Sequence, residues 1–260
     1  MLTNDYKNHL TKMLSALPGS VSMVYKNLCE ADEFSYQEDQ KLIAASVIKL
    51  PMMITLFDMA QKGEMKWDEE FTVTEDVKVP SCGALTYMHN GLRVTLRDLC
   101  TLMIILSDNT ATNMVFDRVG ADRVNETLRR LGCTDTTLRR KMFDAESSRK
   151  GIQNHITASE IALLLEKLAK GQCISPDADR EMLRILSDQR LNGKIPFHLH
   201  AMDIDVAHKT GEDSGTTHDV AVVFTEKPFV LCFASNNTDV PAFERIMQDI
   251  ARDLAIENNR

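Results

Sequence analysis

The sequence predicts an α/β fold of the α+β type: an antiparallel sheet flanked by the N- and C-terminal helices, plus a mostly helical lobe. Strand-like alternation occurs near both ends of the chain, whereas the middle has helical spacing and helix-end signals. Both ends therefore complete one sheet around a helical middle. We place the sheet lobe at about 1–44 and 191–260 and the helical lobe at about 45–190, within a single domain of 260 residues.

The ends of the chain supply the predicted sheet. Residues 3–16 have the spacing of an amphipathic helix, and two strands follow at 19–28 and 34–39. Three consecutive strands rich in β-branched residues are predicted at 206–211, 218–225 and 229–235. Residues 241–256 then form a closing amphipathic helix.

The middle of the chain carries helix boundaries. Thr95 with Asp98 and Thr157 with Glu160 fit capping boxes, in which a hydroxyl and a carboxylate satisfy backbone donors reciprocally. Glycines stand where helices should end, at Gly63, Gly120, Gly132 and Gly171. The spacing predicts helix after helix from about 46 to 190.

Composition and charge narrow the classes of partner. The net charge of −8, with no Lys/Arg run, argues against nucleic acid. The six cysteines are scattered singly, and His198 and His200, which show strand-like alternation, have no third ligand at metal spacing. We expect reduced thiols, structural histidines, and neither a metal nor an organic cofactor.

No segment suits a membrane span. The longest apolar run, 42–57, contains Lys49 and is too short. The N-terminal segment lacks the apolar core of a signal peptide. The sequence as written predicts a cytoplasmic protein, or an exported one if a leader was removed. Its oligomeric state is left open.

A lysine inside this apolar run raises the question of its role. Ser46 and Lys49 are three residues apart, so on a helix they lie on one face. Apolar surroundings lower the pKa of an amine, which can then act as a base toward a neighbouring hydroxyl. The same S-x-x-K pattern recurs at 147–150, but in a polar segment that would leave its lysine solvated.

Two further triplets follow in order. Ser107, Asp108 and Asn109 lie between two predicted helices, and Lys209, Thr210 and Gly211 end a predicted strand. Alone, the first is good capping chemistry and the second an ordinary strand end. The ordered set S-x-x-K, S-D-N and K-T-G resembles the class A β-lactamases and penicillin-binding proteins. The resemblance extends over nearly the whole chain.

The resemblance implies roles for the matched residues. Ser46 is the expected nucleophile, Lys49 its base, and Ser107 a proton relay toward the leaving nitrogen. Asn109 holds Lys49 and touches the substrate. The substrate carboxylate is expected on Lys209 and Thr210.

Backbone groups complete the implied site. Gly211 lets the ligand lie against the strand because it has no Cβ. The oxyanion donors are expected to be the backbone N–H groups of Ser46 and Glu212. The Glu212 side chain is unusual here, since it would repel an anionic substrate unless it points away.

One residue of the resembled pattern is missing. Class A enzymes have a glutamate two positions after an arginine, and it activates the deacylating water. After Arg140 this position is Met142. Asp144 and Glu146 are the candidate replacements, and the alternative is that both are solvated loop charges.

The predicted function is therefore that of a serine hydrolase of the β-lactamase type. It forms an acyl-enzyme on Ser46 with a β-lactam, or a related small amide or ester, and hydrolyses it. One alternative is a D-alanyl peptidase, an esterase or a slowly deacylating penicillin-binding protein. Another is a non-catalytic sensor that binds such ligands.

Overall fold

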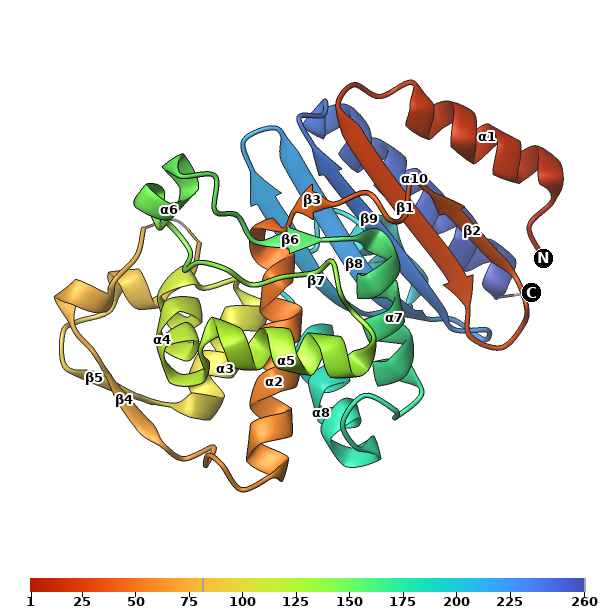
Figure 1. Cartoon of the computed structure of the whole chain (residues 1–260). Helices are drawn as coiled ribbons and strands as arrows, with labels where there is room; N and C mark the ends of the chain where they lie inside the picture. The colour runs from red at the N-terminus through yellow and green to blue at the C-terminus, as the bar shows by residue number, and fades with distance from the viewer. Residues whose placement is uncertain (81, 260) are drawn as a thin grey trace.

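A five-stranded antiparallel sheet built from both ends of the chain organises the molecule (Figure 1). The computed structural model describes residues 1–80 and 82–259. The strand order is β2-β1-β9-β8-β7. The strands span β1 Ser20–Asn27, β2 Glu33–Tyr36, β7 Asp205–Asp213, β8 Thr216–Phe224 and β9 Phe229–Asn236. This confirms the predicted fold class and the five predicted strands.

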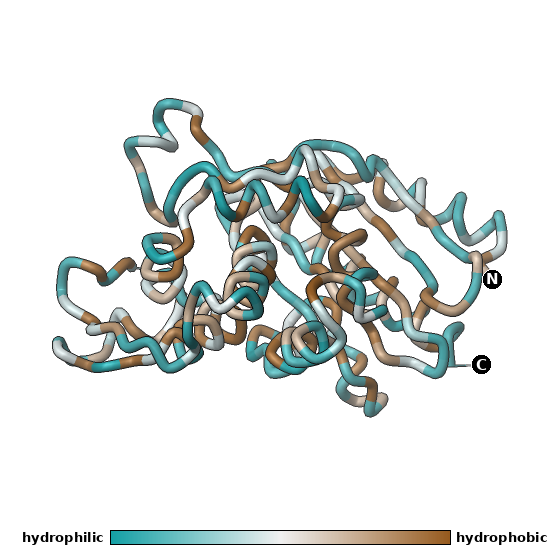
Figure 2. The backbone as a smooth tube through the Cα atoms, turned by 60° about the horizontal axis from the view of Figure 1, so that its bottom comes forward, coloured by the Kyte–Doolittle hydropathy of each residue, from teal (hydrophilic) through white to brown (hydrophobic). Residues whose placement is uncertain are grey.

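The terminal helices cover one face of the sheet, and the helical lobe lies against the other (Figure 1). The terminal helices are α1 Asn4–Ser15 and α10 Val240–Asn258. Between them and the sheet lies one apolar cluster, which includes Leu10, Phe233 and Phe243. A larger cluster joins the other face to the helical lobe. The more hydrophobic stretches run through the interior, while peripheral loops are mostly hydrophilic (Figure 2).

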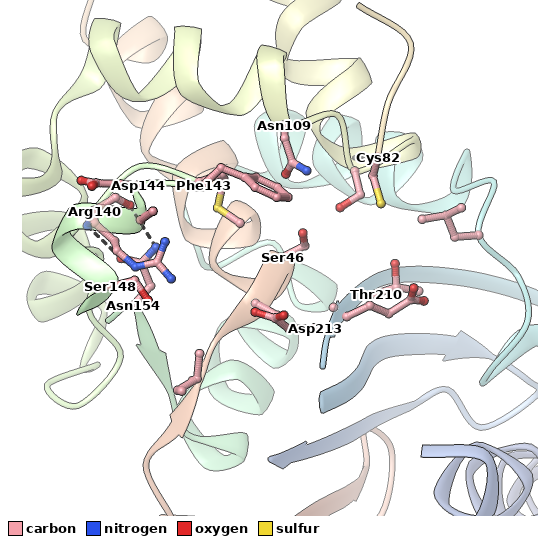
Figure 3. A pocket seen from close by; sticks show the side chains of 18 residues that line it. Ser46, Cys82, Asn109, Arg140, Phe143, Asp144, Ser148, Asn154, Thr210 and Asp213 are labelled. Carbon is pink, nitrogen blue, oxygen red and sulfur yellow. Dashed lines mark hydrogen bonds between the residues drawn. The ribbon is translucent and has the colours of Figure 1, made fainter. Parts of the chain in front are cut away.

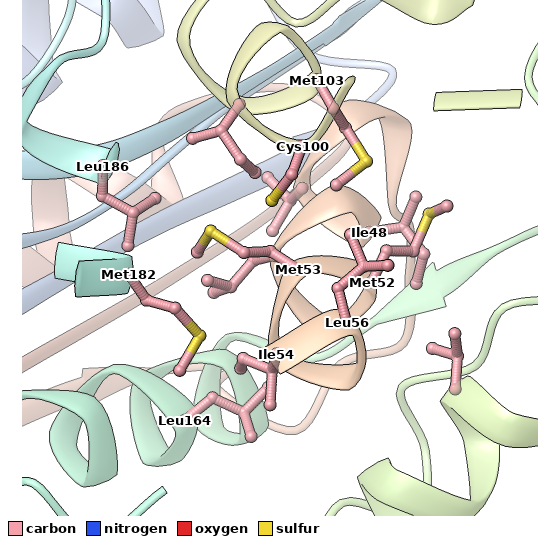
Figure 4. Packing of buried hydrophobic residues seen from close by; sticks show 14 of the residues in the cluster. Ile48, Met52, Met53, Ile54, Leu56, Cys100, Met103, Leu164, Met182 and Leu186 are labelled. Carbon is pink, nitrogen blue, oxygen red and sulfur yellow. The ribbon is translucent and has the colours of Figure 1, made fainter. Parts of the chain in front are cut away.

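Helix α2 is the axis of the helical lobe. The surrounding helices are α3 Leu96–Ile105, α4 Asn109–Val119, α5 Ala121–Leu131, α7 Ala158–Ala169 and α8 Pro176–Ser187. In α2, Lys49–Gln61, every residue from Lys49 to Met59 is buried, so the helix is apolar all round rather than amphipathic. Met52, Met53 and Ile54 pack against residues of α3, α7 and α8 (Figure 4).

Most predicted helix boundaries are confirmed. Thr95 and Asp98 form the capping box of α3. Thr157 caps α7 by accepting from the Glu160 N–H, but the Glu160 carboxylate accepts from the backbone N–H groups of residues 134–136 instead of closing a box. The four predicted glycines follow or cap the ends of α2, α4, α5 and α7, all with positive φ.

The middle is mostly helical as expected, apart from short strands, and the strand-like interpretation of His198 and His200 is wrong. The middle is not purely helical, because β4 Glu70–Val73 pairs with β5 Leu92–Thr95, and β3 Leu42–Ile43 pairs with β6 His155–Ile156. His198 and His200 lie in a helical segment, α9 Pro196–Leu199 followed by η4 His200–Met202. A proline at the first turn starts this helix and overrides the short alternation. Short elements also occur at η1 Ala45–Ile48, η2 Glu75–Val77, η3 Leu85–Tyr87 and α6 Ala145–Arg149.

Among the described residues, no helix is both long and apolar enough to cross a bilayer.

Candidate active site

Ser46 lies at the junction of sheet and helical lobe, in the 3-10 turn η1. Ser46 and Lys49 do not belong to one α-helix, because α2 begins only at Lys49. The turn is strained: Ala45, directly before Ser46, has a φ of 41°. Pro51 falls within the first turn of α2, where a backbone N–H has no helical partner to lose.

Lys49 is fully buried below Ser46 and is held by residues that follow α3. Its Nζ lies 2.8 Å from the Ser107 carbonyl, 3.0 Å from Ser107 Oγ and 2.8 Å from Asn109 Oδ1. Burial lowers the pKa of Lys49 well below its usual value, and the charge of Lys209 lowers it further. The structure thus brings Lys49, Ser107 and Asn109 together, and the lysine environment favours a neutral amine.

A neutral Lys49 fits this set of neighbours. Its amine donates to the Ser107 carbonyl and Asn109 Oδ1, and Ser107 Oγ is the third polar atom within hydrogen-bond distance of its Nζ. Lys209 Nζ in turn lies 3.1 Å from Ser107 Oγ and donates to it. The Ser107 hydroxyl therefore connects the two buried lysines. None of the hydrogen bonds among the described residues uses the Ser46 hydroxyl, which remains available to a substrate.

Asp108 fixes the geometry of this loop. Ser107 has a φ of 53°, and the buried Asp108 carboxylate accepts from the backbone N–H groups of Ala84, Leu85 and Ala111. A side chain at Gly83 would collide with Asp108, since an ideal Cβ there lies 2.3 Å from its Cγ. Asp108 also has the capping role that the triplet allows, since it is the N-cap of α4. The structure shows it tying the loop before η3 to the start of α4.

Strand β7 forms the opposite wall. Lys209 is fully buried, and burial lowers its pKa to about 7. Gly211 lies against Ser46: an ideal Cβ there would be 3.3 Å from the Ser46 backbone nitrogen and 2.8 Å from His218 Cδ2. Because Gly211 has no side chain, the space between the Ser46 N–H and the edge of β7 stays free. The predicted oxyanion site requires this space.

The two histidines beside the K-T-G segment belong to the scaffold. His218 Nε2 donates to the Ile43 carbonyl, and its Nδ1 accepts from the Ser235 N–H. Burial lowers the pKa of His218 to about 4, so the ring is neutral and ties β8 to β3 and β9. His208 Nδ1 lies 2.8 Å from the buried Asp219 carboxylate.

The charge of the Glu212 side chain is compensated by Lys194. Lys194, only 4% exposed, lies 3.0 Å from the Glu212 carboxylate, and it also donates to the carbonyls of Gly211 and His218. The negative charge that seemed to oppose an anionic substrate is thus compensated locally. No sequence signal distinguished this lysine, because it lies 15 residues before Lys209 in an ordinary loop.

The loop after α5 presents Met142 to the site. The Met142 N–H donates to Asn113 Oδ1, and its carbonyl accepts from Asn113 Nδ2, so the backbone is clamped on both sides. Asp144 lines the same cavity, but its two oxygens accept from the Ser147 N–H and hydroxyl as the cap of α6. The Glu146 side chain is 72% exposed and pairs with Lys150. Among these three, only Met142 and Asp144 face the cavity.

These elements enclose a cavity of about 570 Å³ beside Ser46 (Figure 3). Its lining includes Ser46, Ser107, Asn109, Met142, Asp144, Thr210, Gly211, Glu212 and Asp213. Lys49 and Lys209 both contact the side chain of Ser107, which lines the cavity. In residues 1–80 and 82–259, no group of three His, Cys, Asp or Glu side chains lies close enough to hold a metal ion. The arrangement suits attack by a serine on a carbonyl group.

The fold and this cluster define a class, the superfamily of class A β-lactamases and penicillin-binding serine hydrolases. The chain belongs to the Beta-lactamase enzyme family, whose profile matches residues 5–257. It is 23% identical over 222 residues to Beta-lactamase AER-1 of Aeromonas hydrophila, covering 84% of this chain and 73% of that protein.

Solved structures agree over nearly the whole chain. A β-lactamase from Sphaerobacter thermophilus is similar with a TM-score of 0.89 and 28% identity, covering 97% of each chain. PBP-A, solved as a mutant in an acyl-enzyme complex with penicillin G, has a TM-score of 0.87 at 24% identity, covering 97% of this chain and 96% of the other. The second likeness concerns the fold alone.

Proposed function

We propose that this protein is a serine hydrolase that forms an acyl-enzyme on Ser46 with β-lactams or related amides and esters. One observation carries the proposal: a fully buried lysine with a lowered pKa follows, three residues later, a half-buried serine that lines an open cavity, and it contacts Ser107 of the same cavity. A lysine buried without an ion-pair partner among the described residues is costly to keep charged, and use of its neutral amine as a base accounts for its position.

The residues suffice for acylation. Ser46 Oγ attacks the carbonyl carbon while Lys49 takes its proton, directly or through a water. The N–H groups of Ser46 and Glu212 stabilise the negative charge on the carbonyl oxygen. The C–N or C–O bond then breaks, and Ser107 gives its proton to the leaving atom and regains one from Lys49. Lys209 and Thr210 bind the carboxylate of the substrate.

We further propose that deacylation is slow. Met142 faces the cavity at the position where the resembled enzymes have a glutamate, and it offers no base for a water. Asp144 is held by Ser147, and its hydrogen bonds to that residue lower its pKa, which makes it a weaker base. This favours a penicillin-binding protein or a slow esterase over an efficient β-lactamase.

Intact-protein mass spectrometry tests acylation. Incubation with benzylpenicillin should add the full mass of the antibiotic to the wild type and nothing to Ser46→Ala. Ser147→Ala is the matched control, since Ser147 begins the other S-x-x-K segment and should label normally. A wild type that stays unmodified under saturating drug would disprove acylation. Ligand-induced thermal stabilisation persisting in that case would favour a non-catalytic sensor.

Substrate type is a separate measurement. Turnover of nitrocefin compared with p-nitrophenyl esters distinguishes a β-lactamase from an esterase. Slow nitrocefin turnover with a stable adduct is the expected result.

A further inference from the structure

The row of residues on one face of β7 has an ordered charge pattern. Side chains on a strand alternate between faces, so Lys209, Gly211 and Asp213 share the face that meets η1. Gly211 lies against the Ser46 backbone nitrogen. Gly211 therefore marks the place along β7 that lies beside the nucleophile. The buried cation of Lys209 stands two residues before it, and the carboxylate of Asp213 stands two residues after it. At about 3.4 Å per residue, the two charged positions are roughly 13 Å apart along the backbone.

Among the acidic residues that line the cavity, Asp213 has the fewest cations and hydrogen-bond donors around its carboxylate. Glu212 pairs with Lys194, and Asp144 is occupied by Ser147. The Asp213 carboxylate accepts one hydrogen bond, from the N–H of Ser214, and no Lys, Arg or His of the described residues lies within 4.0 Å of it. In Figure 3 its carboxylate projects from the end of β7 toward the part of the cavity between Ser46 and Asn154.

Arg140 is the positive residue that could oppose this assignment. It lines the same cavity, but its guanidinium donates twice to Gln153 Oε1 and once to the Lys141 carbonyl. The charge of Arg140 acts on Asp144, whose pKa it helps to lower, and these acceptors are neutral. They nevertheless hold the group against its own loop, whereas the Asp213 carboxylate remains open to a ligand.

We propose that Asp213 selects substrates whose acyl side chain carries a protonated amine, while Lys209 binds a carboxylate on the leaving-group side. The inference rests on the proposed acylation of Ser46 and specifies its substrate class. A substrate lying along β7 places its scissile carbonyl at Gly211 and its two charged ends at the two charged residues. An exposed ion pair of this kind changes rates by about two- to fivefold.

Three penicillins with the same phenyl side chain provide the test. Benzylpenicillin, ampicillin and carbenicillin carry a hydrogen, an amine and a carboxylate at the same carbon. Their second-order acylation rate constants would be measured by quenched mass spectrometry at pH 6.5, where an α-amino group is protonated. Ampicillin should acylate the wild type fastest and carbenicillin slowest, with about two- to fivefold between successive compounds.

Two variants isolate the carboxylate. Asp213→Asn should bring the ampicillin to benzylpenicillin ratio close to one and accelerate carbenicillin. Asp205→Asn removes the same charge from the exposed far end of β7 and should keep the wild-type ratio. Raising the salt concentration should weaken the preference in the wild type only, because it screens exposed charges.

The outcomes separate the two proposals. Equal rates for the three penicillins, or an unchanged ratio in Asp213→Asn, would overturn the inference while leaving acylation intact. Fastest reaction with carbenicillin would overturn it too and assign selection to Arg140. The absence of any adduct would reject acylation itself, and with it the substrate class.

Discussion

Two segments of this chain share the S-x-x-K pattern and have opposite surroundings. Lys49 is fully buried in α2, and its amine contacts Ser107 and Asn109. The Lys150 side chain is 63% exposed at the end of α6 and pairs with Glu146 one turn earlier. Ser46 opens onto the cavity, whereas the Ser147 hydroxyl donates to Asp144.

The difference shows which property would let a lysine in an S-x-x-K pattern act as a base. Water and the Glu146 carboxylate stabilise the charge of the exposed Lys150. Desolvation destabilises the charge of Lys49, so this amine can take a proton from a neighbour and pass it on. The apolar run around Lys49, rather than the motif itself, supplies that desolvation.

The largest expected effect comes from replacing each lysine in turn. Lys49→Met should slow acylation by roughly 10³- to 10⁴-fold, because it removes the base from the site. Lys150→Met should leave the rate within about twofold, since an exposed pair contributes little. Stopped-flow measurement with a fluorescent penicillin would check both. Comparable losses in the two variants would remove the distinction between the segments.

A second change gives the loop the carboxylate that it lacks. Met142→Glu should shorten the lifetime of the penicillin adduct by about 100-fold, because the clamped backbone would direct a base at the acyl group. Decay of the adduct mass after removal of free drug is the measurement. Glu146→Gln is the control and should not alter the lifetime. An unchanged lifetime in Met142→Glu would mean that position 142 cannot direct a water.

A smaller effect should appear in the pH dependence. Lys209 binds a carboxylate only while charged, and its pKa of about 7 means that this charge is lost as the pH rises through 7. The rate constant for acylation by benzylpenicillin should therefore fall by up to about tenfold per pH unit above that value. Lys49 acts when neutral, and its lowered pKa means that its own limb rises with pH. A neutral ester should lack the fall, and a flat penicillin profile from pH 6 to 9 would contradict the assignment.

Sequence alone was sufficient for the fold class, the five main strands and the three motifs whose residues meet at the cavity, but it also named Glu146, which points away, and omitted Lys194. Strand and helix periodicities are local, and the three motifs mark segments that long-range packing joins. Ser107 and Lys209 are 102 residues apart, yet only the structure shows their side chains 3.1 Å from each other. The roles proposed for these residues await the experiments above.

What the sequence did not reveal depends on partners distant along the chain. The Glu212 charge looked unfavourable until Lys194 was found beside it. The position of Glu160 fitted a capping box. Its carboxylate instead accepts three hydrogen bonds, from the backbone N–H groups of residues 134–136, where a capping box would give it one. The pairing of β4 with β5 was missed because four-residue strands give little periodic signal.

The close fit around Gly211 has a consequence for engineering. Because even a methyl group there would meet His218 and the Ser46 nitrogen, this position is closed to variation. Libraries aimed at altered selectivity should instead randomise its neighbours on the rim, Asp213 and Met142 first. The protein would thereby change what it accepts while the atoms that perform the reaction stay where they are.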